Sequence, residues 1–168
     1  MGILSGNPQE EPMHYGEVFC TWGFLHAAKL ALISHQTLLN HTGDEDLRKF
    51  LTSVMDNAKQ EIEQLEKLLK ENEIALPPSP PERPNADLES IPVGARFNDP
   101  EIAAMLSADI GAGLIACSKN MAQGIREDII MMFDQFHTQK ATLGGKLLRM
   151  TKEKGWLVPP PLHLSKAE

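Results

Sequence analysis

The sequence predicts an all-α protein: a four-helix bundle with one long proline-rich crossover between its second and third helices. Apolar residues recur at spacings of three, four or seven over four long stretches, which is one face of a helix. No stretch alternates apolar and polar residues as a strand does. Residues 75–98 contain about half of the twelve prolines. The length of 168 residues suits one domain.

The first two helices are predicted over residues 13–41 and 44–72, joined by a tight turn at Gly43. Thr42 and Glu45 have the spacing of a capping box at the start of the second helix. The inward faces of the two helices comprise Val18, Trp22, Leu25, Leu32 and Leu39, then Leu47, Leu51, Val54, Ala58, Ile62, Leu65 and Leu69. The outer face of the second helix carries carboxylate–lysine pairs, which is typical of a solvated surface.

The third helix is predicted to begin at Asp99, which we expect to cap it, with Pro100 in the first turn, and to end near Gln123. Its inward face comprises Ile102, Met105, Leu106, Ile110, Leu114 and Cys117. Small residues at 108, 111–113 and 116 make one side thin, so another helix can approach closely.

The fourth helix is predicted over residues 126–154, with an inward face of Ile129, Phe133, Phe136, Leu143, Leu147 and Met150. Gly155 suits a left-handed residue after the helix, and Trp156 is placed to fold back on Met150.

The proline-rich segment is better interpreted as a crossover within one bundle than as a linker between two domains. A helical hairpin of about 60 residues alone buries too little apolar surface to be stable. A helix of about 29 residues is roughly 43 Å long, and about 22 extended residues reach roughly 68 Å. Two short turns and one long crossover make a ferritin-like bundle over 13–158, with tails at 1–12 and 159–168. The third helix is then parallel to the second, and the fourth to the first.

The composition excludes several classes of partner. The net charge of −7 and pI of about 5.4 argue against nucleic acid and against an anionic membrane surface. No apolar run approaches about 18 residues, so we expect no membrane span, and the N-terminus lacks the features of a secretory signal. Cys20 and Cys117 lie in apolar helical patterns, as buried free thiols in a reducing compartment do.

A ferritin-like di-iron site needs Glu-x-x-His motifs, and the sequence contains none. The nearest match is Asp134 with His137 on the fourth helix. His26, Glu61 and Asp109 lie near the matching depth on the other three helices, so the five residues are a candidate site for iron, manganese or zinc. The alternative is that Asp134 and Glu61 are solvated and that His26 and His137 are histidines at the edge of the core. No cofactor is expected on that alternative.

His14 and Glu17 are three residues apart at the start of the first helix and are a second candidate pair for one ligand. A first-turn glutamate also simply favours the positive end of the helix dipole. Phe19, Trp22 and Phe24 are expected in the core. No nucleophile–base set can be assembled from the sequence, which argues against an enzyme.

Three segments resemble one known family: "HYGEVFCTWGFL", "IPVGARFND" and "LLRMTKEKGWLVPPP". It is a family of uncharacterised proteins from endospore-forming bacteria, described as spore-coat-like or ferritin-like, and the resemblance covers residues 13–161. Members often carry two tandem copies, so a single copy implies a homodimer. The residues that match its motifs are His14, Gly16, Glu17, Trp22, Gly155, Trp156 and Pro160.

The resemblance implies a link to sporulation and no established activity. We therefore expect a non-enzymatic structural or interaction protein, cytoplasmic or in the spore coat, that contacts itself and other spore proteins. A divergent ferritin-like metal-binding protein is the alternative. A third possibility is an apolar ligand held between helices, beside the thin side of the third helix.

Overall fold

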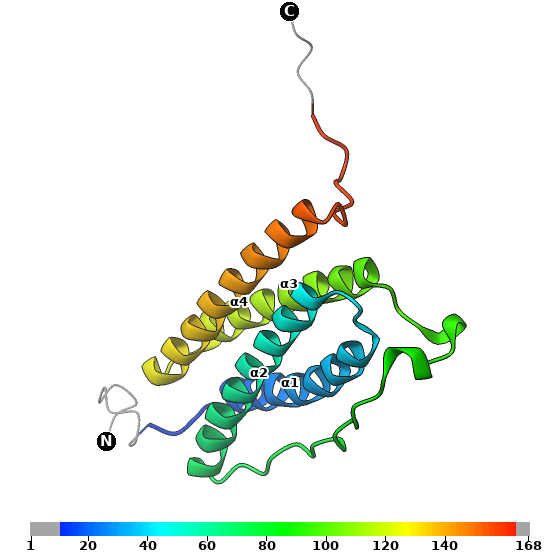
Figure 1. Ribbon diagram of the computed structural model, residues 1–168. Coiled ribbons are helices and arrows are strands. Elements are labelled where there is room, and N and C mark those ends of the chain that lie inside the picture. Colours follow the sequence, from blue (N-terminus) through cyan, green and yellow to red (C-terminus); the bar gives the residue numbers. More distant parts are fainter. Residues whose placement is uncertain (1–10, 164–168) are drawn as a thin grey trace, which may run out of the picture.

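The computed structural model describes residues 11–163 and confirms an all-α four-helix bundle (Figure 1). The described residues contain no strand. The helices are α1 (Tyr15–His41), α2 (Glu45–Glu71), α3 (Asp99–Gln123) and α4 (Glu127–Glu153), with two 3-10 turns in the crossover, η1 (Leu88–Ser90) and η2 (Val93–Ala95). Each α-helix begins and ends within two residues of its predicted bounds.

The bundle consists of two antiparallel pairs, α1 with α2 and α3 with α4, and the pairs meet through α1–α3 and α2–α4 contacts. Lys154, after the end of α4, donates to the Asp44 carboxylate before α2 at 2.7 Å. Asp99 at the start of α3 accepts a hydrogen bond from the backbone N–H of Gly43, which follows α1, at 3.0 Å. These contacts place α3 parallel to α2 and α4 parallel to α1, as the long crossover predicts.

The crossover, hereafter the strap (residues 74–98), runs alongside α1 from the end of α2 to the start of α3 (Figure 1). Trp22, Lys29 and Gln36, spaced by seven residues and therefore on one face of α1, hydrogen-bond to its backbone. Their partners are the carbonyl of Ala75 at 3.0 Å, the carbonyl of Pro77 at 2.9 Å and the N–H of Arg83 at 2.8 Å. The partners follow the same order as the helix residues, so the strap runs parallel to α1.

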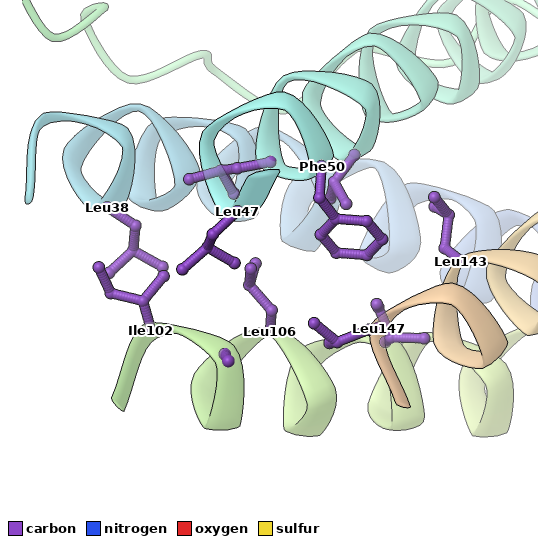
Figure 2. Close-up of a cluster of buried hydrophobic side chains, with 11 residues drawn as sticks. Leu38, Leu47, Phe50, Ile102, Leu106, Leu143 and Leu147 are labelled. Carbon is purple, nitrogen blue, oxygen red and sulfur yellow. The ribbon is translucent and has the colours of Figure 1, made fainter. Parts of the chain in front are cut away.

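The core has two clusters of buried side chains. Figure 2 shows the first, in which residues of all four helices meet: Leu38, Leu47, Phe50, Ile102, Leu106, Leu143 and Leu147. The second comprises Leu25, Leu65, Leu68, Leu69, Cys117, Ile129, Phe133 and Phe136. Trp156 and Met150 both pack against the first cluster, and Gly155 is left-handed with a φ of 70°.

Two predicted helix caps are wrong by one or two residues. Asp44, not a box of Thr42 and Glu45, caps α2 by accepting two backbone N–H groups at 3.0 Å. The Thr42 hydroxyl is buried and donates to a carbonyl in the last turn of α1, so it is not available to α2. Asn98, not Asp99, caps α3.

Two residues predicted for the core are instead exposed. Phe19 is 75% exposed because it follows the buried Glu17 by two residues, which places it on the opposite side of α1. Met105 is 40% exposed and lines a groove between α1 and α3.

Within residues 11–163, one helical stretch is long and apolar enough to pass a test for membrane spans, although the sequence predicts no such span. By length and composition alone, Val93–Gln123 is apolar enough to cross a membrane, with a mean hydropathy of 1.4 in its 18-residue window. Only 28% of that window is buried, and α3 packs along α4 and α1. The expectation that the protein has no membrane partner stays a prediction.

Candidate functional site

A cavity of about 90 Å³ lies between the four helices and is lined by five polar side chains. They are His35 from α1, Asn57 and Glu61 from α2, Asp109 from α3 and Lys140 from α4. The rest of the wall is apolar, made of Phe24, Ala27, Ala28, Ala31, Val54, Ala58, Ile110, Gly113 and Leu143. Polar groups from all four helices therefore converge at one point in the bundle.

Glu61 and Lys140 form a partly buried ion pair across α2 and α4. Lys140 Nζ donates to Glu61 Oε2 at 2.8 Å, and Oε1 is also 2.8 Å from the same nitrogen but outside hydrogen-bonding geometry. A Cβ added at Gly113 would lie 2.8 Å from the Lys140 side chain, so this glycine of α3 leaves the space through which the lysine reaches Glu61.

The surroundings of the pair shift two pKa values. Burial raises the pKa of Glu61 above its ordinary value, although the Lys140 ammonium opposes this shift. Burial also raises the pKa of the Cys117 thiol to about 12. The raised thiol pKa indicates an unreactive cysteine, because the thiolate is the nucleophile.

His35 and Asp109 form the second polar pair of the cavity. Their Nε2 and Oδ2 atoms are 3.2 Å apart, with the His35 side chain buried and that of Asp109 half exposed. The hydrogen bond from His35 lowers the pKa of Asp109. The other ring nitrogen of His35, Nδ1, has no hydrogen-bond partner.

The structure does not assemble the predicted five-residue metal set. Glu61 and Asp109 both line the cavity, whereas His26 stacks with the Trp22 ring at a centroid distance of 5.5 Å. Asp134 is exposed and His137 is half-buried outside the cavity, because each follows a buried phenylalanine by one residue and so turns away from the interior. Within residues 11–163, no group of three or more His, Cys, Asp or Glu side chains is arranged to hold a metal ion.

In the alternative interpretation, only the solvated Glu61 is wrong, since this residue is 1% exposed. Asp134 is exposed, and His26 and His137 are half-buried, as that alternative expects. Sequence reasoning missed Lys140 as the partner of Glu61, and His35 as a further residue of the cavity. A signal existed for Lys140: it follows Phe133 by seven residues and precedes Leu143 by three, which is the register of the apolar face of α4. Charged residues in a core register on facing helices indicate a buried ion pair.

The second candidate pair, His14 and Glu17, bonds to the protein itself. His14 caps α1 by accepting from the N–H of Gly16 at 3.0 Å, and its Nε2 lies 3.0 Å from the Gln123 carbonyl at the end of α3. Glu17 is 2% exposed. Its Oε2 accepts from the His14 N–H at 3.2 Å, and its Oε1 accepts from the N–H groups of residues 125 and 126 at 2.8 and 2.9 Å. One carboxylate therefore joins the start of α1 to the start of α4.

Arg126 completes this junction. Its guanidinium donates to both Asp128 oxygens, to the side chain of Asn72 at the end of α2, and to the Glu11 carbonyl. The Asp128 carboxylate raises the pKa of Arg126. The residues of the first family motif therefore bond within the protein. His14 and Glu17 fix helix ends, and Trp22 holds the strap.

Comparison with known proteins agrees with the fold and with the resemblance to uncharacterised, spore-coat-like proteins. The chain is 58% identical over 166 residues to the uncharacterized protein YvdQ of Bacillus subtilis (strain 168), covering 99% of this chain and 98% of YvdQ. A crystal structure from Bacillus halodurans C-125, described as that of a putative spore coat protein, superposes with a TM-score of 0.93. The two are 52% identical, over 95% of this chain and 100% of that one.

The family model that matches is described as a protein of unknown function, DUF3231, and it spans residues 1–168. The match covers the whole length and extends through the strap and all four helices. The chain therefore belongs to the DUF3231 family.

Proposed function

We propose that the protein is a non-enzymatic structural component of the bacterial spore coat. The observation that carries the proposal is its similarity, at 52% identity and a TM-score of 0.93, to a protein described as a putative spore coat protein. The motif residues fit this proposal, because His14, Glu17 and Trp22 hold helix ends and the strap and do not line the cavity.

A structural protein must bind neighbours, and we propose that this one forms a homodimer through exposed apolar side chains. Tyr15 and Phe19, one turn apart on α1, are 94% and 75% exposed. Ile115 of α3 and Met131 of α4 are 73% and 72% exposed. Large apolar side chains at such exposure are typical of interaction surfaces when they cluster. Other spore proteins are further candidates for these faces.

Fractionation of sporulating cells tests the proposed location. An antibody against the untagged protein is applied to growing cells, sporulating cells, coat extracts and decoated spores of the same strain. The protein is expected late in sporulation and in the coat extract. Equal amounts in growing cells, or retention in decoated spores, would refute a coat role.

Light scattering after size exclusion tests the proposed dimer. The wild type is compared with Phe19→Ser and with Glu63→Ser, a control at an exposed residue of α2. A dimer that dissociates in Phe19→Ser but persists in Glu63→Ser supports the α1 face as the contact. A monomeric wild type at all accessible concentrations excludes the homodimer.

A further inference from the structure

Two buried side-chain atoms within residues 11–163 lack a hydrogen-bond partner, and both belong to residues of the same cavity. They are His35 Nδ1 and Glu61 Oε1, on side chains that are 4% and 1% exposed. Oε1 has an ion-pair contact with Lys140 Nζ at 2.8 Å, outside hydrogen-bonding geometry. Buried polar atoms in native proteins nearly always have a partner, so two such atoms in one cavity require an explanation. A ligand that hydrogen-bonds to both atoms provides one.

The hydrogen-bonding character of the two atoms limits the ligand. His35 Nε2 faces the Asp109 carboxylate at 3.2 Å and therefore carries a proton. Nδ1 is then an acceptor in the neutral ring and a donor in the charged ring, while a Glu61 carboxylate oxygen only accepts. A hydroxyl group both donates and accepts, so hydroxyls satisfy both atoms in either state of the imidazole.

The charges around the cavity favour a neutral ligand. The Lys140 ammonium, 2.8 Å from both Glu61 oxygens, already neutralises that carboxylate and repels a further cation. The Asp109 carboxylate in the wall of the cavity repels an anion. A neutral molecule avoids both penalties.

The volume and walls of the cavity favour a small organic molecule. One water requires roughly 10–15 Å³ of such space, so about 90 Å³ holds roughly six water-sized groups. Mostly apolar walls with a few convergent polar groups are typical of small-molecule sites. A groove of about 370 Å³ between α1 and α3 lies beside the cavity and shares Ala31, His35 and Asp109 with it.

We propose that this cavity binds a small neutral polyol of about the size of glycerol. One hydroxyl donates to Glu61 Oε1, and a second bonds to His35 Nδ1. The site is independent of the coat role, which requires no ligand, and it uses neither His14 nor Glu17.

Alanine methyl groups report binding directly. The full chain is labelled at alanine methyl carbons and titrated with glycerol and with erythritol. Ala28 and Ala58 line the cavity, whereas Ala104 and Ala122 are exposed on α3 and serve as internal controls. Saturable shifts of the lining methyls, without shifts of the controls, are the expected result.

Two variants test whether the shifts come from the cavity. Ala28→Leu fills part of the space and is expected to abolish the shifts, while Ala104→Leu, outside the cavity, is expected to preserve them. Glu61→Gln preserves the shape but exchanges the charged acceptor for a neutral one, and we expect a dissociation constant raised about tenfold. This second variant keeps the proposal testable if Ala28→Leu does not fold.

Several results would overturn the proposal. One is a titration with no saturable shift of the lining methyls for either polyol. Another is a response to Zn²⁺, Mn²⁺ or acetate but not to the polyols, which would indicate an ion site. Shifts that persist in Ala28→Leu, together with an unchanged dissociation constant in Glu61→Gln, would place the binding elsewhere.

Discussion

Replacing Glu17 by alanine should destabilise the whole bundle, because one buried carboxylate joins the start of α1 to the start of α4. Glu17 accepts three backbone N–H groups, those of His14, Ile125 and Arg126. Only the hydrogen bond from Arg126 is fully buried; the other two are partly exposed. After truncation, water can therefore reach two of the donors but not the third.

The magnitude follows from that difference. A buried donor left without a partner costs about 1–3 kcal/mol, and a hydrogen bond that water replaces costs about 0.5–1 kcal/mol. Two of the latter and one of the former give about 3 kcal/mol for Glu17→Ala. Glu17→Gln keeps an oxygen for Ile125 and Arg126 but turns an amide NH₂ toward the His14 N–H, so we expect about 1 kcal/mol.

Urea unfolding followed by circular dichroism at 222 nm measures both changes. With a slope of about 2 kcal/mol per molar urea, a loss of 3 kcal/mol lowers the midpoint by about 1.5 M. Glu63→Ala, at an exposed position of α2, is the control and should change the free energy of unfolding by less than about 0.5 kcal/mol. A loss below about 1 kcal/mol for Glu17→Ala, with an unchanged slope, would refute the inferred role of this carboxylate.

Three further predictions concern the interior. Burial raises the pKa of Glu61 above its ordinary value of 4.5, so the contribution of Glu61 to the free energy of unfolding is greatest below pH 4.5 and declines as the pH rises. Urea unfolding of the wild type and Glu61→Gln at a series of pH values from below 4.5 upward should show the wild type losing stability relative to the variant. Cys20 should react with a thiol reagent at pH 8 in the folded protein, whereas Cys117, fully buried with a pKa of about 12, should react only in urea; equal rates would contradict its burial. Gly111→Ala meets no atom within 4 Å and should stabilise the protein by up to about 1 kcal/mol, whereas Gly113→Ala meets Lys140 at 2.8 Å and should gain less; equal thermal midpoints would show that Lys140 moves aside without cost.

The architecture was predictable because it depends on repetition and length. Each helix carries its apolar residues at helical spacing over about 25 residues or more, a signal that tolerates errors at single positions. The course of the strap followed from the small size of each hairpin and the reach of an extended chain. The caps failed because Thr42 and Asp44, or Asn98 and Asp99, are equally good caps in sequence, and only the packed turn decides which side chain faces the free N–H groups.

The candidate site was predictable only in part, for a different reason. The position of a residue along the bundle axis follows from its residue number and the rise of about 1.5 Å per residue. This position brings Glu61 and Asp109 to the same cavity, as predicted. The direction in which a side chain points from a helix changes by about 100° with each residue. A difference of one residue is therefore enough to turn Asp134 and His137 away from the cavity. Lys140 lies in the apolar register of α4 and pairs with Glu61, but lysines lie mostly at the surface, so composition alone does not predict this partner.

The parallel course of the strap along α1 has a consequence for how the chain folds. The entropic cost of closing a loop grows with its length. A long loop that attaches at intermediate residues closes as a series of short loops, and each of these has a small cost. The contacts of Ala75, Pro77 and Arg83 with α1 divide the crossover into short segments, each closed from the one before. The two hairpins have local contacts, so their helices are expected to pair first, in a transient form that only the complete bundle stabilises. The strap would then attach progressively toward the end of α1, and bring the second hairpin into place against the first.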